Sequence, residues 1–416
     1  MADRLRESPT RTDPVAAAMS AVVGGPVGVH SAGHRWWSPG RVLLVATGAA
    51  LAAGMLAKSA CVPSGWSKDA QPFAQLCWTD VAGRSADSGL PPHVAGWLGE
   101  AARHLPGSGT VAATAWLALL LATLALIATA LLVRVEPRRP WAAAGWALAP
   151  VLVAHWLSWD LVPAVGVAVL LWGWVTGRPW VAGIAAGVGV AFALPVVAAL
   201  VGVVAVGRTW RDRAATLLAA AGAYVVVALP GRAVTEVPDV GSVWLYLGPV
   251  GSGGASTLRT VTSLVVLGLA GVAGLWLVRR SSGPTPRLAA RVGLLLLVAA
   301  LVVAPSAPPE TSLLVLPLAA LAIDRWRDLL VWQGTALVSW VITGWYVGGA
   351  IEPTVTGDSR AYWIAILLRV AGLAWLAVAV LADAAQASVD DHPVDVRRRE
   401  PDAHGDLVAD LRDPGA

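Results

Sequence analysis

Charged residues are scarce in this chain, making up 13% of its 416 residues, whereas 56% are hydrophobic. A helix needs about 20 apolar residues to cross the hydrocarbon core of a bilayer, and several runs reach that length. No water-soluble core accounts for so many runs in one chain of this size. The sequence therefore predicts an all-α, polytopic membrane protein with about 10 to 12 transmembrane helices. The longest runs are Thr110 to Val133, Thr260 to Val278, Leu329 to Gly349 and Ala361 to Leu381.

The chain also has few groups suited to binding a metal or a nucleic acid. It contains two cysteines, and its histidines and loop carboxylates lack the spacing of a zinc site. Its net charge is +4, but the arginines stand at the ends of apolar runs and form no basic patch with interleaved aromatic residues. We therefore expect no metal, no cofactor and no nucleic-acid partner.

The two ends of the chain differ from its middle. Residues 1–40 have no apolar segment near their start, so they do not resemble a cleavable signal peptide. Residues 384–416 are rich in Asp, Arg, His and Pro and cannot bury enough apolar surface to fold alone. We expect a disordered cytoplasmic arm at 1–40, a transmembrane domain at 41–383 and a disordered cytoplasmic tail at 384–416.

Arginine-rich turns alternate with turns that carry few basic residues, and cytoplasmic loops of membrane proteins are enriched in Lys and Arg. We therefore predict a multi-pass protein of the cell membrane with both termini in the cytoplasm. The basic turns lie at 134–139, 178, 208–213, 279–291 and 324–327. The connections predicted to be extracytoplasmic are 59–109, 156–160, 231–259, 305–312 and 350–360.

The run from Trp180 to Gly207 is long enough for one span, yet arginines flank both of its ends. Pro195 lies near its middle, and a proline interrupts the hydrogen bonds of a helix. We predict two short antiparallel half-spans that meet near Pro195, shielded from lipid by neighbouring helices. The alternative is one tilted helix with a proline kink, which would place Arg208 to Arg213 on the opposite side.

Cys61 and Cys77 both fall in the long connection 59–109, the part predicted to face an oxidising compartment. We expect them to form a disulfide, which would stabilise the loop by roughly 3 kcal/mol on the chain-entropy model. The alternative is two unpaired thiols.

Asp80 stands three residues after Cys77, beside Trp78. A carboxylate positioned at a bilayer surface can take the proton from a sugar hydroxyl as that hydroxyl attacks an anomeric carbon. A solvated loop aspartate has the same local sequence, so the spacing alone leaves both interpretations open.

Several short motifs occur in the order found in a known family. The actinobacterial members of glycosyltransferase family 87, which are polyprenol-phosphate-mannose-dependent mannosyltransferases, open with a K-x-P-C…W…C-Y-S-D loop and continue with N-W-D-L and G-R-P-x-x-A-G segments. This chain resembles them over most of residues 58–381. The corresponding segments are Lys58-Ser59-Ala60-Cys61, Trp66, Cys77-Trp78-Thr79-Asp80, Ser158-Trp159-Asp160-Leu161, Gly177-Arg178-Pro179-Trp180-Val181-Ala182-Gly183, and a C-terminal stretch from Leu316-Pro317 through Arg325-Trp326-Arg327 to Ile366-Leu367-Leu368-Arg369.

The resemblance implies a glycosyltransferase of the C superfamily, which moves mannose from a polyprenyl-phosphate donor to a lipid-linked acceptor on the outer face. Asp80 would be the general base and Asp160 the second candidate, although Asp160 also suits a helix cap. Trp78, Trp159 and His155 are the candidates for contact with the substrate. His155 and His93 could assist a phosphate or a sugar, and the alternative for each is a merely structural histidine near a helix end.

An arginine inside an apolar run has a polar partner or reaches the interface. Arg369 lies about two turns inside the last run, so we expect it to bind the donor phosphate or a carboxylate such as Asp160. Arg259 is a second candidate for the phosphate, with an interfacial anchor as the alternative.

Two lysines expected from the resemblance are absent. In the family's A-A-K-x-x-P pattern, the position of the lysine is occupied here by Phe192. In the family's N-K-x-Y-S-P-Q-Y motif, the position of the lysine is occupied by Pro305, and the segment here is Ala304-Pro305-Ser306-Ala307-Pro308-Pro309-Glu310-Thr311. Three hypotheses therefore remain: an active mannosyltransferase with a remodelled donor site, a catalytically degenerate paralogue that acts as a partner in envelope assembly, or a lipid or solute transporter.

Overall fold

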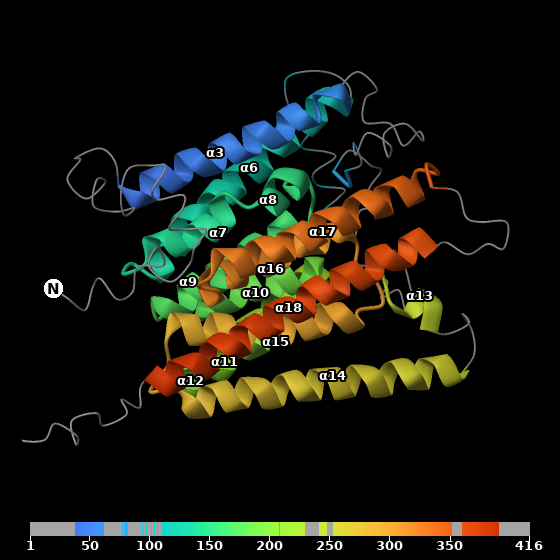
Figure 1. The fold of residues 1–416 in the computed structure, drawn as a ribbon. Helices are drawn as coiled ribbons and strands as arrows, with labels where there is room; N and C mark the ends of the chain where they lie inside the picture. Colours follow the sequence, from blue (N-terminus) through green and yellow to red (C-terminus); the bar gives the residue numbers. More distant parts are fainter. Residues whose placement is uncertain are drawn as a thin grey trace, which may run out of the picture.

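The protein is all-α, as the sequence predicts, and the part of the chain that the structure describes contains no strand. In the computed structural model the long helices run roughly side by side, with α3 and α14 at opposite edges of the bundle (Figure 1). The described residues are 38–61, 77, 79–81, 94, 97, 101, 104, 106, 110–207, 209–228, 241–247, 253–351 and 360–390.

The α-helices, in chain order, are α3 (Pro39–Ala57), α6 (Thr110–Val135), α7 (Ala144–Ala147), α8 (Pro150–His155), α9 (Leu161–Val175), α10 (Pro179–Phe192), α11 (Val196–Ala205), α12 (Trp210–Ala228), α13 (Trp244–Leu247), α14 (Gly253–Arg280), α15 (Pro286–Val303), α16 (Ser312–Ala322), α17 (Trp326–Val347) and α18 (Arg360–Asp390). Short 3₁₀ helices lie at Ser59–Cys61 (η2), Pro140–Ala143 (η4) and Pro309–Thr311 (η5).

Five of the described helices are long and apolar enough to cross a bilayer, namely those containing Pro39–Ala57, Ala112–Val135, Thr257–Arg280, Pro286–Val303 and Tyr362–Gln386. Four shorter apolar helices lie among them, and together they make the polytopic membrane protein that the apolar runs predict. Helix ends differ from the predicted ends: α18 continues to Asp390, past the predicted boundary at 383, and α3 begins at Pro39 after a Ser38 cap. The rest of the predicted arm and tail lies outside the described residues.

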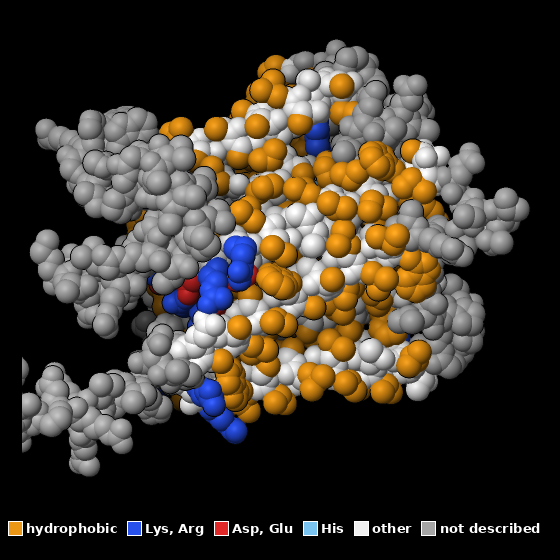
Figure 2. All heavy atoms as spheres, viewed as in Figure 1, with side chains coloured by type: hydrophobic (Ala, Val, Ile, Leu, Met, Phe, Trp, Pro, Cys, Tyr) orange, Lys and Arg blue, Asp and Glu red, His pale blue; other side chains and the backbone are white. Residues whose placement is uncertain are grey.

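An ionic cluster identifies one end of the bundle. Asp324, between α16 and α17, forms salt bridges with Arg139, just before η4, and with Arg287 and Arg291 of α15. Figure 2 shows most of the basic side chains on one face gathered toward the left, with acidic side chains beside them and a largely hydrophobic surface elsewhere. We call this the basic end. The arginine-rich turns at 134–139, 279–291 and 324–327, which the sequence places on one side of the membrane, thus lie together at this end.

Contacts between α3 and α6 locate the opposite end. Gly40 at the start of α3 approaches Val133 near the end of α6, and Thr47 and Thr129 share a hydrogen bond of 2.8 Å. The two helices are therefore antiparallel, and α6 ends near Arg139 at the basic end. The far end of α3, at Lys58, consequently lies at the opposite end, which we call the carboxylate end.

The break predicted near Pro195 is present. Helix α10 ends at Phe192 and α11 begins at Val196. Gly177 to Pro179, at the start of α10, and Val204 and Gly207, at the end of α11, line one pocket at the basic end. The chain therefore returns to the side from which it entered, which excludes a single kinked span.

The core is centred on α16, in which every residue is buried. It packs against α9 and α15, and α11 lies against α15 so closely that Gly202 and Gly293 face each other. The half-spans α10 and α11 thus pack on neighbouring helices, and the buried core lies between the basic end and the carboxylate end.

Candidate functional site

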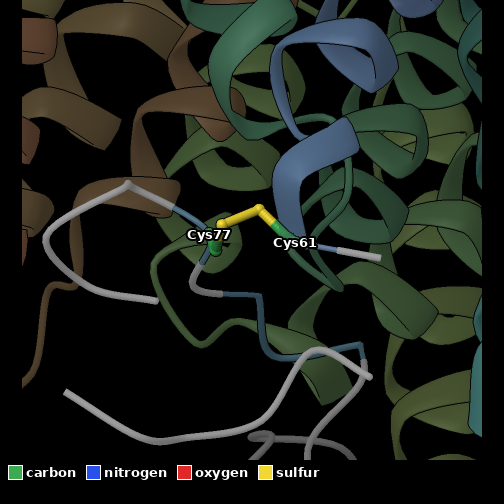
Figure 3. Close-up of a disulfide and its surroundings, with 2 residues drawn as sticks. All are labelled: Cys61 and Cys77. Carbon is green, nitrogen blue, oxygen red and sulfur yellow. A yellow bond between two sulfur atoms is a disulfide. The ribbon is translucent and has the colours of Figure 1, made fainter. Parts of the chain in front are cut away.

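A disulfide joins Cys61, in η2 just after α3, to Cys77, and this is the pair that the sequence predicts (Figure 3). The Cα atoms of the two residues are 5.5 Å apart, and both side chains are buried. The crosslink ties the segment 77–81 to the end of α3. Helix α3 is itself held close to α8, because Gly54 leaves no room for a side chain against the carbonyl oxygen of Val153 and the indole of Trp156.

Beyond the disulfide, the segment 79–81 lies on the corner between α8 and α9. The hydroxyl of Thr79 donates to the carbonyl oxygen of Leu157 at 2.6 Å. The carboxylate of Asp80 accepts a hydrogen bond from Ser158 Oγ at 3.1 Å and another from the main-chain N–H of Trp159 at 3.2 Å. Residues 78 positions apart in the chain are thereby joined, and Asp80 is held in one orientation.

Asp160 lies next to Asp80, and the two carboxylates interact electrostatically. Burial and the nearby charge of Asp160 raise the pKa of Asp80 to about 7, against the opposing effect of its hydrogen bonds with Trp159 and Ser158. Burial also raises the pKa of Asp160, to about 6. A carboxylate whose pKa lies near neutrality both accepts and releases a proton readily, which suits a general base.

Asp160 precedes α9 in the cap position, but its side chain makes no capping hydrogen bond. The cap alternative from the sequence is therefore not realised in the structure. The indole of Trp159 is buried, and what this residue contributes to Asp80 is its main-chain N–H.

Two charged residues to which sequence reasoning gave no role lie near these aspartates. Lys58, at the end of α3, is 6% exposed, and Glu310, in η5 before α16, is 4% exposed. Glu310 interacts electrostatically with Asp80, Asp160 and Lys58. Burial lowers the pKa of Lys58, whereas the charges of Glu310 and Asp80 raise it in part. The carboxylate end thus holds a cluster of four charged residues drawn from four separate segments.

Arg369 is buried, as its position in the last apolar run suggests, but its hydrogen bonds are with main-chain carbonyls. It donates to the carbonyl oxygens of Ala307, Gly241 at 3.4 Å and Leu301 at 3.5 Å. No salt bridge joins it to another described residue, and the carboxylate that interacts with it electrostatically is Glu310 rather than the expected Asp160. Arg369 therefore holds the 304–311 connection, which carries Glu310.

The other predicted site residues are less central. His155 is buried with its ring edge-on to Trp340, at a centroid distance of 4.8 Å, and its Nε2 has no hydrogen-bond partner among the described residues. Arg259 lies on α14, which packs mainly on α15 and only slightly on α18. Trp78 and His93 lie outside the described residues, as does most of the loop 59–109.

No group of three or more His, Cys, Asp or Glu residues suited to a metal ion occurs in the described part of the chain. The arrangement combines a carboxylate of near-neutral pKa, a second carboxylate beside it and a lysine, all at one end of a membrane bundle.

Comparisons with protein-family models, curated proteins and solved structures find no match to this chain.

Proposed function

We propose that the protein is a membrane glycosyltransferase that takes mannose from a polyprenyl-phosphate donor and transfers it to a lipid-linked acceptor. The observation that carries this proposal is the position of Asp80, whose carboxylate is oriented by Ser158 and Trp159 beside Asp160. Asp80 takes the proton of the acceptor hydroxyl as the oxygen attacks the anomeric carbon of the donor sugar. The bond between that carbon and the phosphate oxygen breaks, and its electron pair stays on the phosphate.

Asp160 supports this chemistry electrostatically. Its charge raises the pKa of Asp80 and so makes Asp80 a stronger base than an isolated aspartate. When the proton moves to Asp80, the repulsion between the two carboxylates is relieved. The pair therefore favours proton uptake at the time of attack.

The arrangement of charges supports an outward-facing site. Basic residues favour the cytoplasmic side, and the ionic cluster around Asp324 collects basic side chains at one end. The carboxylate end then faces the extracytoplasmic side, where an oxidising compartment maintains the Cys61–Cys77 disulfide. Both termini are cytoplasmic in this orientation, and lipid-linked substrates reach the site within the bilayer.

The proposal is tested by transfer of labelled mannose from polyprenyl-phosphate-mannose to glycolipids, in membranes from cells that lack the native gene copy. Membranes that contain the wild-type protein should transfer label, and membranes with an empty vector should not. A soluble nucleotide sugar, offered instead as the direct donor to the purified protein, should give no product. If the wild-type protein shows no transfer with the lipid donor, the interpretation as a non-catalytic assembly partner replaces the interpretation as an enzyme. Label that crosses the membrane without being transferred would favour a transporter.

A further inference from the structure

A pocket opens at the basic end of the bundle, where α9 and α11 end and where α10 and α12 begin. Its volume is about 70 Å³. A cavity of roughly 10 to 15 Å³ on the same measure holds one water molecule, so this pocket has room for a group the size of a phosphate. It lies at the opposite end of the bundle from Asp80, and the proposed reaction does not use it.

The packing of α10 on α12 holds two sides of this pocket together. Gly183 approaches the main-chain oxygen of Thr216 so closely that an added Cβ would lie 2.3 Å from it, and Gly187 approaches that of Ala220 in the same way, at 2.2 Å. Both pairs are related by the same step along the two helices, so α10 and α12 run parallel and start at the same level. The glycines thus keep the two helix starts at a fixed separation.

Two arginines from different segments line the pocket. Arg178 directly precedes α10, and Arg213 lies in the first turn of α12. Arg213 donates from Nε and Nη2 to the carbonyl oxygen of Gly207, at 3.2 and 2.7 Å, which holds its guanidinium at the pocket. The Cζ atom of Arg178 lies 5.1 Å from the ring centroid of Trp172. Neither arginine forms a salt bridge with a described residue, so an anion in the pocket would meet two positive charges.

Asp212 brings a negative charge to the same pocket. Its main-chain N–H donates to Thr209 Oγ1 at 3.1 Å, but its carboxylate has neither a hydrogen bond nor a salt bridge with any residue that the structure describes. A ligand that carried only negative charge would be repelled by this carboxylate. A ligand with one anionic and one cationic group would instead match the two arginines and the aspartate together.

Exposed apolar side chains continue from the pocket toward the middle of the bundle. Val201 lies one turn from the pocket residue Val204 on α11, and Leu217 lies one turn from Arg213 on α12. Val201 is 48% exposed and Leu217 is 44% exposed, and the two helices are in contact. In a bilayer this surface meets acyl chains, so a phospholipid could place its headgroup in the pocket and its chains along Val201 and Leu217. A soluble phosphate compound would leave these side chains uncovered.

We propose that this pocket binds the headgroup of an aminophospholipid, phosphatidylethanolamine. Its phosphate binds Arg178 and Arg213, its ammonium group binds Asp212, and its acyl chains lie along α11 and α12. Both polar contacts are charge-assisted, which is the stronger class of hydrogen bond. The inference does not depend on mannose transfer. The bound lipid connects the starts of α10 and α12 with the end of α11 and so supports the broken span.

Native mass spectrometry of the purified full-length protein in detergent measures the binding of defined lipids. Wild-type protein should bind dioleoylphosphatidylethanolamine several times more tightly than dioleoylphosphatidylglycerol, whose headgroup has no ammonium group for Asp212. Arg178→Gln should weaken the binding of both lipids by about tenfold or more, because a charge-assisted hydrogen bond to the phosphate is lost. Arg211→Gln removes an arginine of the same turn that does not line the pocket, and it should leave both affinities unchanged.

Asp212→Asn protects the test against misfolding. It removes the partner of the ammonium group and the repulsion of anionic headgroups, so binding of phosphatidylethanolamine should weaken while binding of phosphatidylglycerol tightens. A folding defect cannot produce that gain. Glycerophosphoethanolamine, the same headgroup without acyl chains, should bind at least about tenfold more weakly than the lipid, since it has little apolar surface to bury.

Four results would each overturn the inference. They are equal binding of the two lipids by the wild type, wild-type affinities in Arg178→Gln, an unchanged lipid preference in Asp212→Asn, and binding of glycerophosphoethanolamine as tight as that of the lipid.

Discussion

The carboxylate of Asp80 and the hydroxyl of Ser158 lie 3.1 Å apart, although 78 positions separate them in the chain. This hydrogen bond joins a disulfide-linked loop to the corner between α8 and α9. It also brings Asp80 beside Asp160, whose charge acts on it.

The first prediction concerns the pH dependence of transfer. Asp80 must be ionised to act as a base, and its pKa is raised to about 7, so kcat/KM should rise with pH and level off above neutrality. Replacing Asp160 with Asn removes a neighbouring negative charge, which should lower the pKa of Asp80 and move the acidic limb to lower pH. The pH profiles of kcat/KM for the wild type and Asp160→Asn test this. An acidic limb that stays in place would show that Asp160 does not tune Asp80.

The second prediction concerns the disulfide. Replacing Cys61 and Cys77 together with Ser removes a crosslink with a sequence separation of 16 residues, and the chain-entropy model gives a loss of about 3 kcal/mol. The double variant should unfold at a lower temperature than the wild type, and transfer should fall because the crosslink holds the segment that carries Asp80. A reductant should lower the unfolding temperature of the wild type but not that of the variant. Equal sensitivity of both proteins would argue against a structural disulfide.

A third prediction tests the packing of the broken span. A side chain at Gly202 of α11 would place its Cβ 2.5 Å from the Cα of Gly293 in α15, so the helices would have to separate. Gly202→Val should therefore destabilise the protein by about 1 to 3 kcal/mol, the typical cost of overpacking. Gly222→Val is the matched control, because a Cβ there meets no atom within 4 Å. Thermal unfolding in detergent compares the two, and equal midpoints would contradict the α11–α15 contact.

The fourth prediction separates a structural from a substrate-binding role for Arg369. Arg369→Gln leaves buried carbonyls of Leu301, Ala307 and Gly241 with fewer donors, which costs roughly 1 to 3 kcal/mol for each group left unsatisfied. We expect a lower unfolding temperature and proportionate losses with donor and acceptor. Normal stability combined with a rise in donor KM alone would instead show that Arg369 contacts the donor phosphate.

Much of the fold could be predicted because it depends on local and periodic features. Apolar runs of membrane-spanning length predict the helices, and the arginine turns predict which connections share a side, as Arg139, Arg287 and Arg291 do at Asp324. The break at Pro195 could be predicted from the arginines on both flanks. Helix ends were less accurate, since α18 continues through the mixed polar residues after 383.

The site was only partly predictable because its charges meet through tertiary contacts. Asp80 and Asp160 were candidates from their motifs. Lys58 belongs to a motif that gives it no role, and Glu310 lies in a segment that departs from the expected pattern. A glutamate in a proline-rich connection between apolar runs is the signal that could have identified Glu310 as a site residue. The residues with which it interacts, Lys58, Asp80 and Asp160, lie far from it in the sequence. The depth of Arg369 in the last apolar run makes it a candidate from the sequence. Its carbonyl partners depend on the path of the loops, which the spacing of apolar residues does not predict.

The role of Asp80 as the general base is best tested by the transfer activity of Asp80→Asn. The amide keeps the shape of the side chain and can still lie against Ser158 and Trp159, but it cannot take up a proton. The measurement is transfer of labelled mannose from polyprenyl-phosphate-mannose by purified wild-type and Asp80→Asn protein, compared at equal amounts of folded material. Turnover should fall by about a hundredfold or more, the usual contribution of a general base, while the unfolding temperature stays unchanged. Transfer by Asp80→Asn at the wild-type rate would contradict it.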